Sequence, residues 1–213
     1  MVVDVFIYRL RITSPLKTII LMKKLILLTL LICSISYAFA QTTDTNRPVK
    51  TRLVNGTGMS SANDILKNLS SSPEFATLVS AIKAAALEDT FKDNNAITFF
   101  APTNQAFEKL APGELDSLMQ PAHKAELINL LSYHIIQAKI TSKDINAQIK
   151  GGNGQAIFKT LSGGTLIASI NANRNIVLTD ENGDQSVVSS FDIQQSDGIL
   201  HIVNAVLIPK SKP

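Results

Sequence analysis

The sequence predicts an α+β fold, with helices in the first part of the domain and strands in the second. Three observations support this expectation. Apolar residues recur at helical spacing between residues 65 and 131, and short alternating segments separated by Gly, Asn and Asp run from residue 156 to residue 193. The last run, residues 197–209, is apolar on both faces, which is typical of a central strand.

Helix signals begin at residue 63. Residues 63–69 predict a short helical turn, and Ser72-Pro73-Glu74 combines an N-cap, a proline at the first helical position and an acidic first turn. The next helix has one apolar stripe, made of Phe75, Leu78, Val79, Ile82 and Ala86. We expect this stripe to face the core.

A strand over residues 97–101 interrupts the helical part. Pro102 ends it, and Thr103 then caps a helix that carries Phe107 and Leu110 on one face. Two further helices are expected, one with Leu115, Leu118 and Met119 and one over residues 122–131.

The second part predicts short strands at residues 156–161, 165–170, 175–179 and 186–193. Asn182-Gly183 indicates a hairpin, because both residues accept the positive φ of a type I′ turn. No internal repeat is visible, so one copy of a domain is expected over residues 62–210.

The N-terminal residues have the features of a secretion leader. Residues 22–40 predict a signal peptide, with Lys23 and Lys24 before an apolar stretch and small residues before a cleavage point at Ala40. Residues 1–21 then form an over-extended N-terminus, and residues 41–61 a polar tail or linker. A retained anchor is the alternative, but the apolar stretch is shorter than the roughly 20 residues that a spanning helix needs. A lipoprotein signal does not fit, since Ile32 precedes Cys33.

The composition excludes several classes of partner and chemistry. Without residues 1–40 the chain has 15 basic and 16 acidic side chains, so its basic pI comes from the leader and does not indicate nucleic acid. The single cysteine, Cys33, leaves with the leader, so neither disulfides nor a thiol nucleophile is expected.

No residue pattern predicts catalysis or a metal site. Leu161-Ser162-Gly163-Gly164 lies between two strands and not at the strand-to-helix turn of a serine hydrolase. Residues 180–184 resemble the start of a calcium loop, but Gln185 and Phe191 stand where a Gly and a bidentate Glu are needed. We interpret this segment as a solvated hairpin tip, and we expect no cofactor and no enzyme activity.

Three separated blocks resemble the fasciclin (FAS1) family in the right order. They are residues 98–107, with Ala101-Pro102-Thr103-Asn104 and Ala106-Phe107, then residues 131–136 around Tyr133-His134, and finally residues 197–209. The chain departs from the family at Asp197, where Asn is usual, and at Asn204, where Asp is usual. The resemblance implies a wedge-like β-sandwich with several helices packed on it, and a role in adhesion.

The resemblance also points to candidate partner-binding residues, namely Tyr133, His134 and Asp144. From the residue types, His134 is expected to be a buried neutral imidazole bonded through both nitrogens. Tyr133 is either the exposed half of the pair or a core ring with a bonded hydroxyl. His201 is expected to be buried, and His123 to lie on the surface.

These observations predict a secreted, non-enzymatic protein that mediates cell adhesion or contact with a surface or matrix polymer. Many copies on a surface would multiply weak contacts. The location is periplasmic or extracellular, with cell-surface association and no stable membrane span after cleavage. An extracytoplasmic binder of a small ligand or glycan, with an apolar pocket between helices and sheet, is the alternative. A hydrolase is a third hypothesis.

Overall fold

Helices precede most of the strands along the chain, as the sequence predicts. This computed structural model describes residues 48–93 and 96–210, so the expectations for residues 1–40 lie outside the described residues. The first part contains β1 (Thr51–Val54), β2 (Thr57–Ser60), α2 (Ile65–Ser70), η2 (Pro73–Phe75), α3 (Ala76–Ala85), α4 (Glu88–Asp93), β3 (Ile97–Pro102), α5 (Asn104–Phe107), α6 (Glu114–Leu118), η3 (Pro121–His123) and α7 (Lys124–Tyr133). The second contains β4 (Ile135–Ile136), α8 (Ser142–Gly151), β5 (Gln155–Lys159), β6 (Thr165–Ile170), β7 (Ile176–Thr179), β8 (Gln185–Gln194) and β9 (Gly198–Val203).

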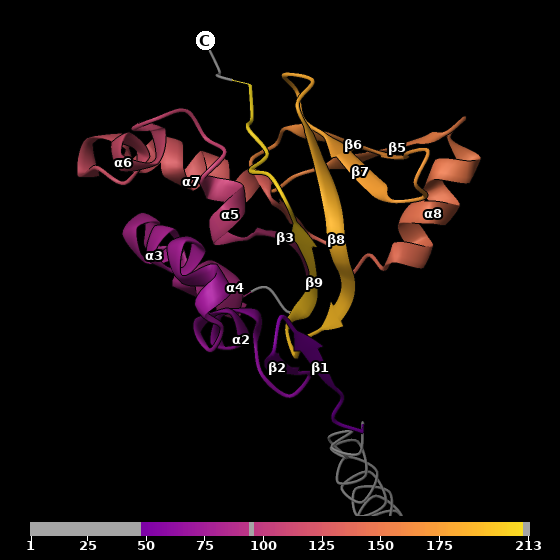
Figure 1. Cartoon of the computed structure of the whole chain (residues 1–213), viewed down its shortest axis with the longest axis horizontal. Helices are drawn as coiled ribbons and strands as arrows, with labels where there is room; N and C mark the ends of the chain where they lie inside the picture. The colour runs from indigo at the N-terminus through magenta and orange to yellow at the C-terminus, as the bar shows by residue number, and fades with distance from the viewer. Residues whose placement is uncertain (1–47, 94–95, 211–213) are drawn as a thin grey trace, which may run out of the picture. The chain divides into compact units, whose positions relative to one another are not determined.

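The strand β9 lies inside a seven-stranded sheet with the order β4-β3-β9-β8-β7-β6-β5 (Figure 1). It pairs parallel with β3 and antiparallel with β8. Every residue of β9 and of β3 is buried. The expectation of a central strand with two apolar faces is therefore confirmed.

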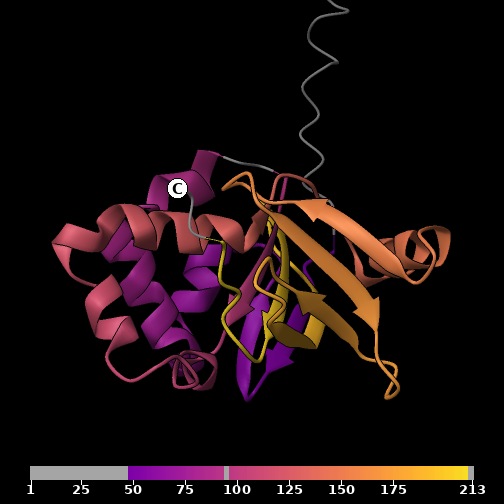
Figure 2. The same cartoon turned by 90° about the horizontal axis from the view of Figure 1, so that it is seen from above.

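Two cores lie on opposite faces of β3 and β9. Phe99 and Leu200 belong to the core shared with α2, α3 and α7, whereas Phe100 and Val203 belong to the core shared with α8 and strands β5–β8. Figure 2 shows the helices α2–α7 on one side of these two strands, and α8 with strands β5–β7 on the other. The expected α+β fold, a wedge-like β-sandwich with several helices packed on it, is confirmed, and the strands of the sandwich belong to one strongly curved sheet.

The curved sheet almost closes on itself. The N–H of Leu161, just after β5, donates to the carbonyl of Ile135 in β4 at 2.8 Å. The two border strands therefore touch at one end, while the rest of β5 remains a free border.

The expected polar tail over residues 41–61 is wrong for its second half. Residues 51–60 form the hairpin β1–β2, and its Val54 and Met59 are buried in the core shared with the helices. Asn55 and Gly56 connect the strands, and both have positive φ, 43° and 85°. These are the features of a type I′ turn, because such a turn needs positive φ at both central positions.

The hairpin at Asn182-Gly183 forms, but with a different turn. Only Gly183 of the pair has positive φ, at 91°. The N–H of Gly183 donates to the carbonyl of Asp180, and the N–H of Asp180 donates to the carbonyl of Asp184. This matches a three-residue loop with Gly in the left-handed conformation and not the expected type I′ turn.

The sequence analysis assigned no element to α4, β4 or α8. Helix α8 is amphipathic, with Ile145 and Ile149 buried. Among residues 48–93 and 96–210, no helix is both long and apolar enough to cross a membrane.

Candidate functional site

Tyr133 is a core residue that joins three segments. It ends α7 and is fully buried. Its hydroxyl donates to the carbonyl of Thr165 at 2.6 Å and accepts from the N–H of Glu181 at 3.1 Å. Burial raises the pKa of this phenol well above its ordinary value. A Cβ on Gly164 would stand 2.6 Å from the ring, so the backbone approach that Tyr133 needs is available only with glycine there.

His134 is buried and bonded through both ring nitrogens, as expected. Its Nδ1–H donates to the carbonyl of Leu130 at 2.9 Å, and its Nε2 accepts from the N–H of Leu207 at 3.0 Å. Burial lowers the pKa of His134 to about 4, although the bond to Leu130 and the charge of Asp180 oppose this shift. The ring is therefore neutral at pH 7 and has one fixed tautomer.

The loop between β7 and β8 holds the residues that follow β9. Asp180 is buried; its Oδ1 accepts from the N–H groups of Asn182 and Asp184, and its Oδ2 accepts from the N–H of Ile208 at 2.9 Å. Asn182 donates to the carbonyl of Ile208, and Glu181 accepts from the N–H of Lys210. We call His134, Asp180, Glu181 and Asn182 the C-terminal clamp. The interpretation of residues 180–184 as a solvated tip is wrong for Asp180.

Burial changes the interpretation of the first two candidate residues. Tyr133 is 0% exposed and His134 is 1% exposed, so neither side chain offers an outer surface to a partner in this structure. Of the two alternatives for Tyr133, the structure shows the core ring. Within the fold, the pair bonds the loop after β7 and the segment after β9, through the N–H groups of Glu181 and Leu207.

Asp144 is exposed at the start of α8. Its carboxylate forms a capping box with Thr141, because it accepts from the N–H and the hydroxyl of Thr141 while the Thr141 hydroxyl accepts from the N–H of Asp144. These hydrogen bonds from Thr141 lower the pKa of Asp144. The carboxylate is thus ionised at neutral pH and open to solvent.

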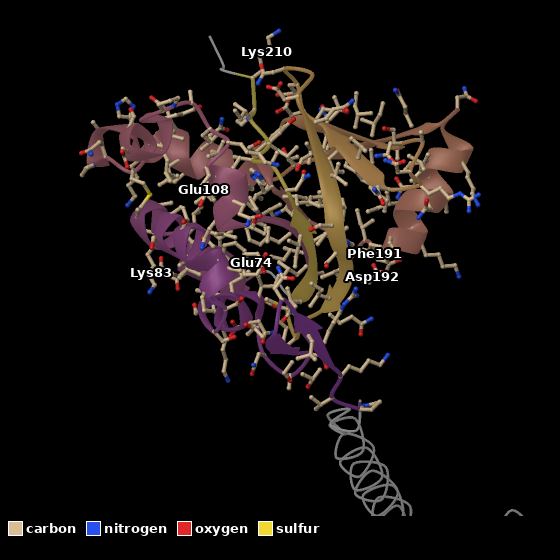
Figure 3. All side chains as sticks on the ribbon, viewed as in Figure 1. Glu74, Lys83, Glu108, Phe191, Asp192 and Lys210 are labelled. Carbon is tan, nitrogen blue, oxygen red and sulfur yellow. The ribbon has the colours of Figure 1, made fainter. Side chains whose placement is uncertain are left out.

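Asp192 on β8 also positions the first turn of α8. It lies at an irregularity in the pairing of β8 with β9 and has a φ of 61°. Its carboxylate accepts from the N–H of Ser142 at 2.6 Å and from the Ser142 hydroxyl. Figure 3 labels it beside Phe191 on β8. Sequence reasoning missed this residue, since nothing local connects it with a helix 50 positions earlier.

His201 is the second buried imidazole. Its Nε2–H donates to the carbonyl of Ile140 at 2.9 Å, and its Nδ1 accepts from the N–H of Asp192. The ring stacks on Phe100, with 5.4 Å between centroids. Burial lowers the pKa of His201. Both buried imidazoles thus have both nitrogens engaged with backbone groups, so neither is free to act as a general base.

Within the described part of the chain, no three His, Cys, Asp or Glu side chains are grouped so that they could hold a metal ion. His123 lies on the surface beside Glu126, as expected. A groove with a cavity volume of about 500 Å³ runs between α6, α7 and the segment after β9. Its lining residues are Glu114, Leu118, Ala125, Glu126, Asn129, Leu130, Ile208 and Pro209.

Comparison with known proteins agrees with this architecture. The family model described as "Fasciclin domain" matches residues 73–209. This chain belongs to the fasciclin domain family. Protein sll1483 of Synechocystis is 31% identical over 160 residues, which cover 75% of this chain and 81% of that protein.

Other relatives contain the fasciclin domain within longer chains. Human periostin is 35% identical over 131 residues, which are 62% of this chain and only 14% of periostin. A solved FAS1 domain pair from the insect cell adhesion molecule fasciclin I has a TM-score of 0.60 at 18% identity, covering 70% of this chain and 51% of that one. That structure shows the same fold.

The two positions where this fasciclin domain departs from the family's usual residues both bond the backbone. Asn204 accepts from the N–H of Val187 at 2.8 Å through its side-chain oxygen. Asp197 is buried, and its carboxylate accepts from the N–H of Ile65 at the start of α2. Burial raises the pKa of Asp197 to about 6, and the nearby Asp64 adds to this shift.

The raised pKa of Asp197 predicts that Asp197→Asn changes how the stability of the domain depends on pH. Because the carboxyl binds its proton more tightly in the folded state, this group stabilises the native protein as pH falls from about 6 toward the unfolded pKa of 3.8. The amide of the variant does not titrate. The free energy of unfolding of the variant minus that of the native protein should therefore be about 2 to 3 kcal/mol higher at pH 7 than at pH 4. Urea unfolding at both pH values measures this difference. Asp116→Asn, at an exposed carboxylate, is the control, and equal pH responses of the two variants would contradict the assignment.

Proposed function

We propose that this fasciclin domain is an exported, non-enzymatic module that attaches cells to a surface, a matrix polymer or one another. One observation supports this most: the polar residues of the family motifs are used inside the fold. The Tyr133 hydroxyl and both buried imidazoles bond backbone groups. The Asp180 carboxylate, outside the three motifs, does so too. Polar groups that are bonded to the backbone in this way are not available for catalysis. We therefore assign the function to the outer surface.

Relatives and structural neighbours point the same way. The insect protein whose FAS1 pair shares this fold is described as a cell adhesion molecule. Relatives from Arabidopsis are described as fasciclin-like arabinogalactan proteins, one of them 31% identical over 161 residues. By analogy, we place this chain in the periplasm or outside the cell.

Among the candidate residues, Asp144 is the one that we propose for direct contact. It is exposed and charged, and the capping box holds it in place. Lys143 beside it is exposed too. Tyr133 and His134 contribute by fixing the loop and the C-terminal segment.

Bead adhesion tests this function. Beads coated with the purified protein should bind the cells that produce it, or a polymer from their surface, well above albumin-coated beads. Asp144→Asn keeps a side-chain oxygen for the capping box but removes the charge, so binding should fall several-fold. Asp116→Asn removes an exposed charge from α6 and should bind as the native protein does.

The outcomes separate the two claims. If native beads bind no surface above the albumin level, the adhesion proposal is wrong. If native and Asp144→Asn beads bind equally, adhesion stands and Asp144 is not the contact.

Binding of a small ligand or glycan is the second candidate, favoured by the groove between α6, α7 and the segment after β9. Its lining includes the apolar residues Leu118, Leu130 and Ile208, and Glu126 and Asn129 supply polar groups. Apolar lining with a few polar groups is typical of ligand sites. A glycan or small-ligand screen whose hits protect these residues would favour this function over adhesion.

A further inference from the structure

The groove between α6, α7 and the segment after β9 has walls that the fold holds in place (Figure 1). Leu130 lines it on the α7 side, and Ile208 lines it on the side of the segment after β9. The ring of His134 bonds both sides, because its Nδ1–H donates to the carbonyl of Leu130 and its Nε2 accepts from the N–H of Leu207. The C-terminal clamp also bonds the N–H and the carbonyl of Ile208. The groove is therefore preformed, as ligand sites usually are.

Apolar side chains from three segments line this groove. Leu118 comes from α6, Leu130 from α7 and Ile208 from the segment after β9. Leu118 and Ile208 are half-buried, so a ligand that covers them removes further apolar surface from water. The volume of about 500 Å³ lies within the range of small-molecule sites, roughly 300 to 1,000 Å³. The groove therefore suits the hydrocarbon part of a small molecule.

Two carboxylates give the same groove a negative charge. Glu114 on α6 and Glu126 on α7 both line it, and among the described residues no Lys or Arg does. One oxygen of Glu114 accepts from the N–H of Ala111, and one oxygen of Glu126 lies 3.1 Å from the Nδ1 of His123. No residue in the described part of the chain bonds the other oxygen of either carboxylate. Each carboxylate therefore has one oxygen left for a ligand.

We propose that this groove binds a free aliphatic amine. Its ammonium group bonds the two glutamates, and its hydrocarbon chain covers the apolar lining residues. A primary amine is protonated at neutral pH and carries three N–H donors, so it supplies what the free carboxylate oxygens lack. An anion would be repelled by both carboxylates, and a neutral sugar would leave their charge without a partner. This inference rests on the second candidate function, binding of a small ligand, and names the ligand class of that site.

Titration with hexylamine, followed by nuclear magnetic resonance, tests the ligand class. The N–H signals of Leu130 and Ile208 should shift on binding. Hexylamine should bind at least about tenfold more tightly than hexanoate, which has a similar hydrocarbon chain and the opposite charge. Hexanol should bind with intermediate affinity. Added salt should weaken the binding of hexylamine, because solvent-exposed charges are screened.

Substitution of the two glutamates locates the ammonium group. Glu126→Gln removes the charge and keeps a side-chain oxygen, so it should weaken hexylamine binding about two- to fivefold, as expected for an exposed ion pair. Glu114→Gln in addition should bring the loss to roughly tenfold. Binding of hexanol should be unchanged in both variants, which checks that the groove is intact. Asp116→Asn, at an exposed carboxylate of α6 that does not line the groove, should bind hexylamine as the native protein does.

Three results would overturn the proposal. They are equal binding of hexylamine and hexanoate, an unchanged affinity for hexylamine after the double substitution, and tighter binding of a blocked lysine peptide than of hexylamine. The last result would identify the ligand as a lysine side chain of a protein and not as a free amine. Failure of the amine remains distinct from failure of the function that it rests on: screen hits of another class that protect the groove would reject the amine alone. Bead adhesion is measured separately from both.

Discussion

Replacing Asp180 with Ala should destabilise the domain by about 3 kcal/mol or more, the largest single-site effect that we expect. The change removes the acceptor of three backbone N–H groups, those of Asn182, Asp184 and Ile208. A buried donor left without a partner costs about 1 to 3 kcal/mol. Urea unfolding measures the loss, and hydrogen exchange should show that the N–H of Ile208 loses protection first.

Two further substitutions make this test specific. Asp184→Ala changes an exposed carboxylate in the same loop and should alter the free energy of unfolding by no more than about 0.5 kcal/mol. Asp180→Asn keeps one acceptor oxygen and should fall between the two. If Asp180→Ala were as stable as Asp184→Ala, the C-terminal clamp would not contribute to stability.

Acid should unfold the native domain largely through its buried histidines. The pKa of His134 is about 4 in the folded state and 6.5 as the ordinary value, so the unfolded chain binds the proton more tightly. The contribution of the neutral His134 ring to the free energy of unfolding is complete above pH 6.5. About 3 kcal/mol of it is lost as pH falls toward 4. His201, whose pKa is also lowered, acts in the same direction, whereas Asp197 opposes both.

The variant His134→Gln isolates the contribution of His134. It should be less stable than the native protein at pH 7, because one of two backbone bonds is lost, but its stability should fall less between pH 7 and pH 4.5. His123→Gln, at the exposed ring beside Glu126, should keep the native pH response. An unchanged response in His134→Gln would show that His134 does not take up a proton on unfolding in this range.

Local periodicity in the sequence predicts the fold class and most helices and strands, and the resemblance of three motif blocks predicts the family. Four residues of the expected stripe, Phe75, Leu78, Val79 and Ile82, are buried, whereas Ala86 is exposed and ends α3 in the left-handed conformation. Thr103 caps α5 by accepting from the N–H of Ala106. His134 and His201 were expected in the core, since a lone histidine among apolar residues is stabilised there by backbone partners. The structure confirms the predictions for Thr103 and for both histidines.

What sequence reasoning missed depends on contacts between distant segments. Local signals were present for two elements, Asn55-Gly56 for the first hairpin and Thr141 with Asp144 for the start of α8. Mostly polar residues surround both signals, so no long hydrophobic period marks the hairpin or the helix. The role of Asp180 had no complete local signal: its bonds to Asn182 and Asp184 follow from a turn motif, but its bond to Ile208 spans 28 positions.

The parallel pairing of β3 with β9 also governs when the domain can acquire its structure. Residues 97–102 cannot form the centre of the sheet until residues 198–203 are available to pair with them. The C-terminal clamp also needs Ile208 and Lys210. Contacts so far apart in the chain make folding slow, because a long loop must close first. During synthesis, nearly the whole polypeptide therefore emerges before it can become compact, which suits the export that we propose for it.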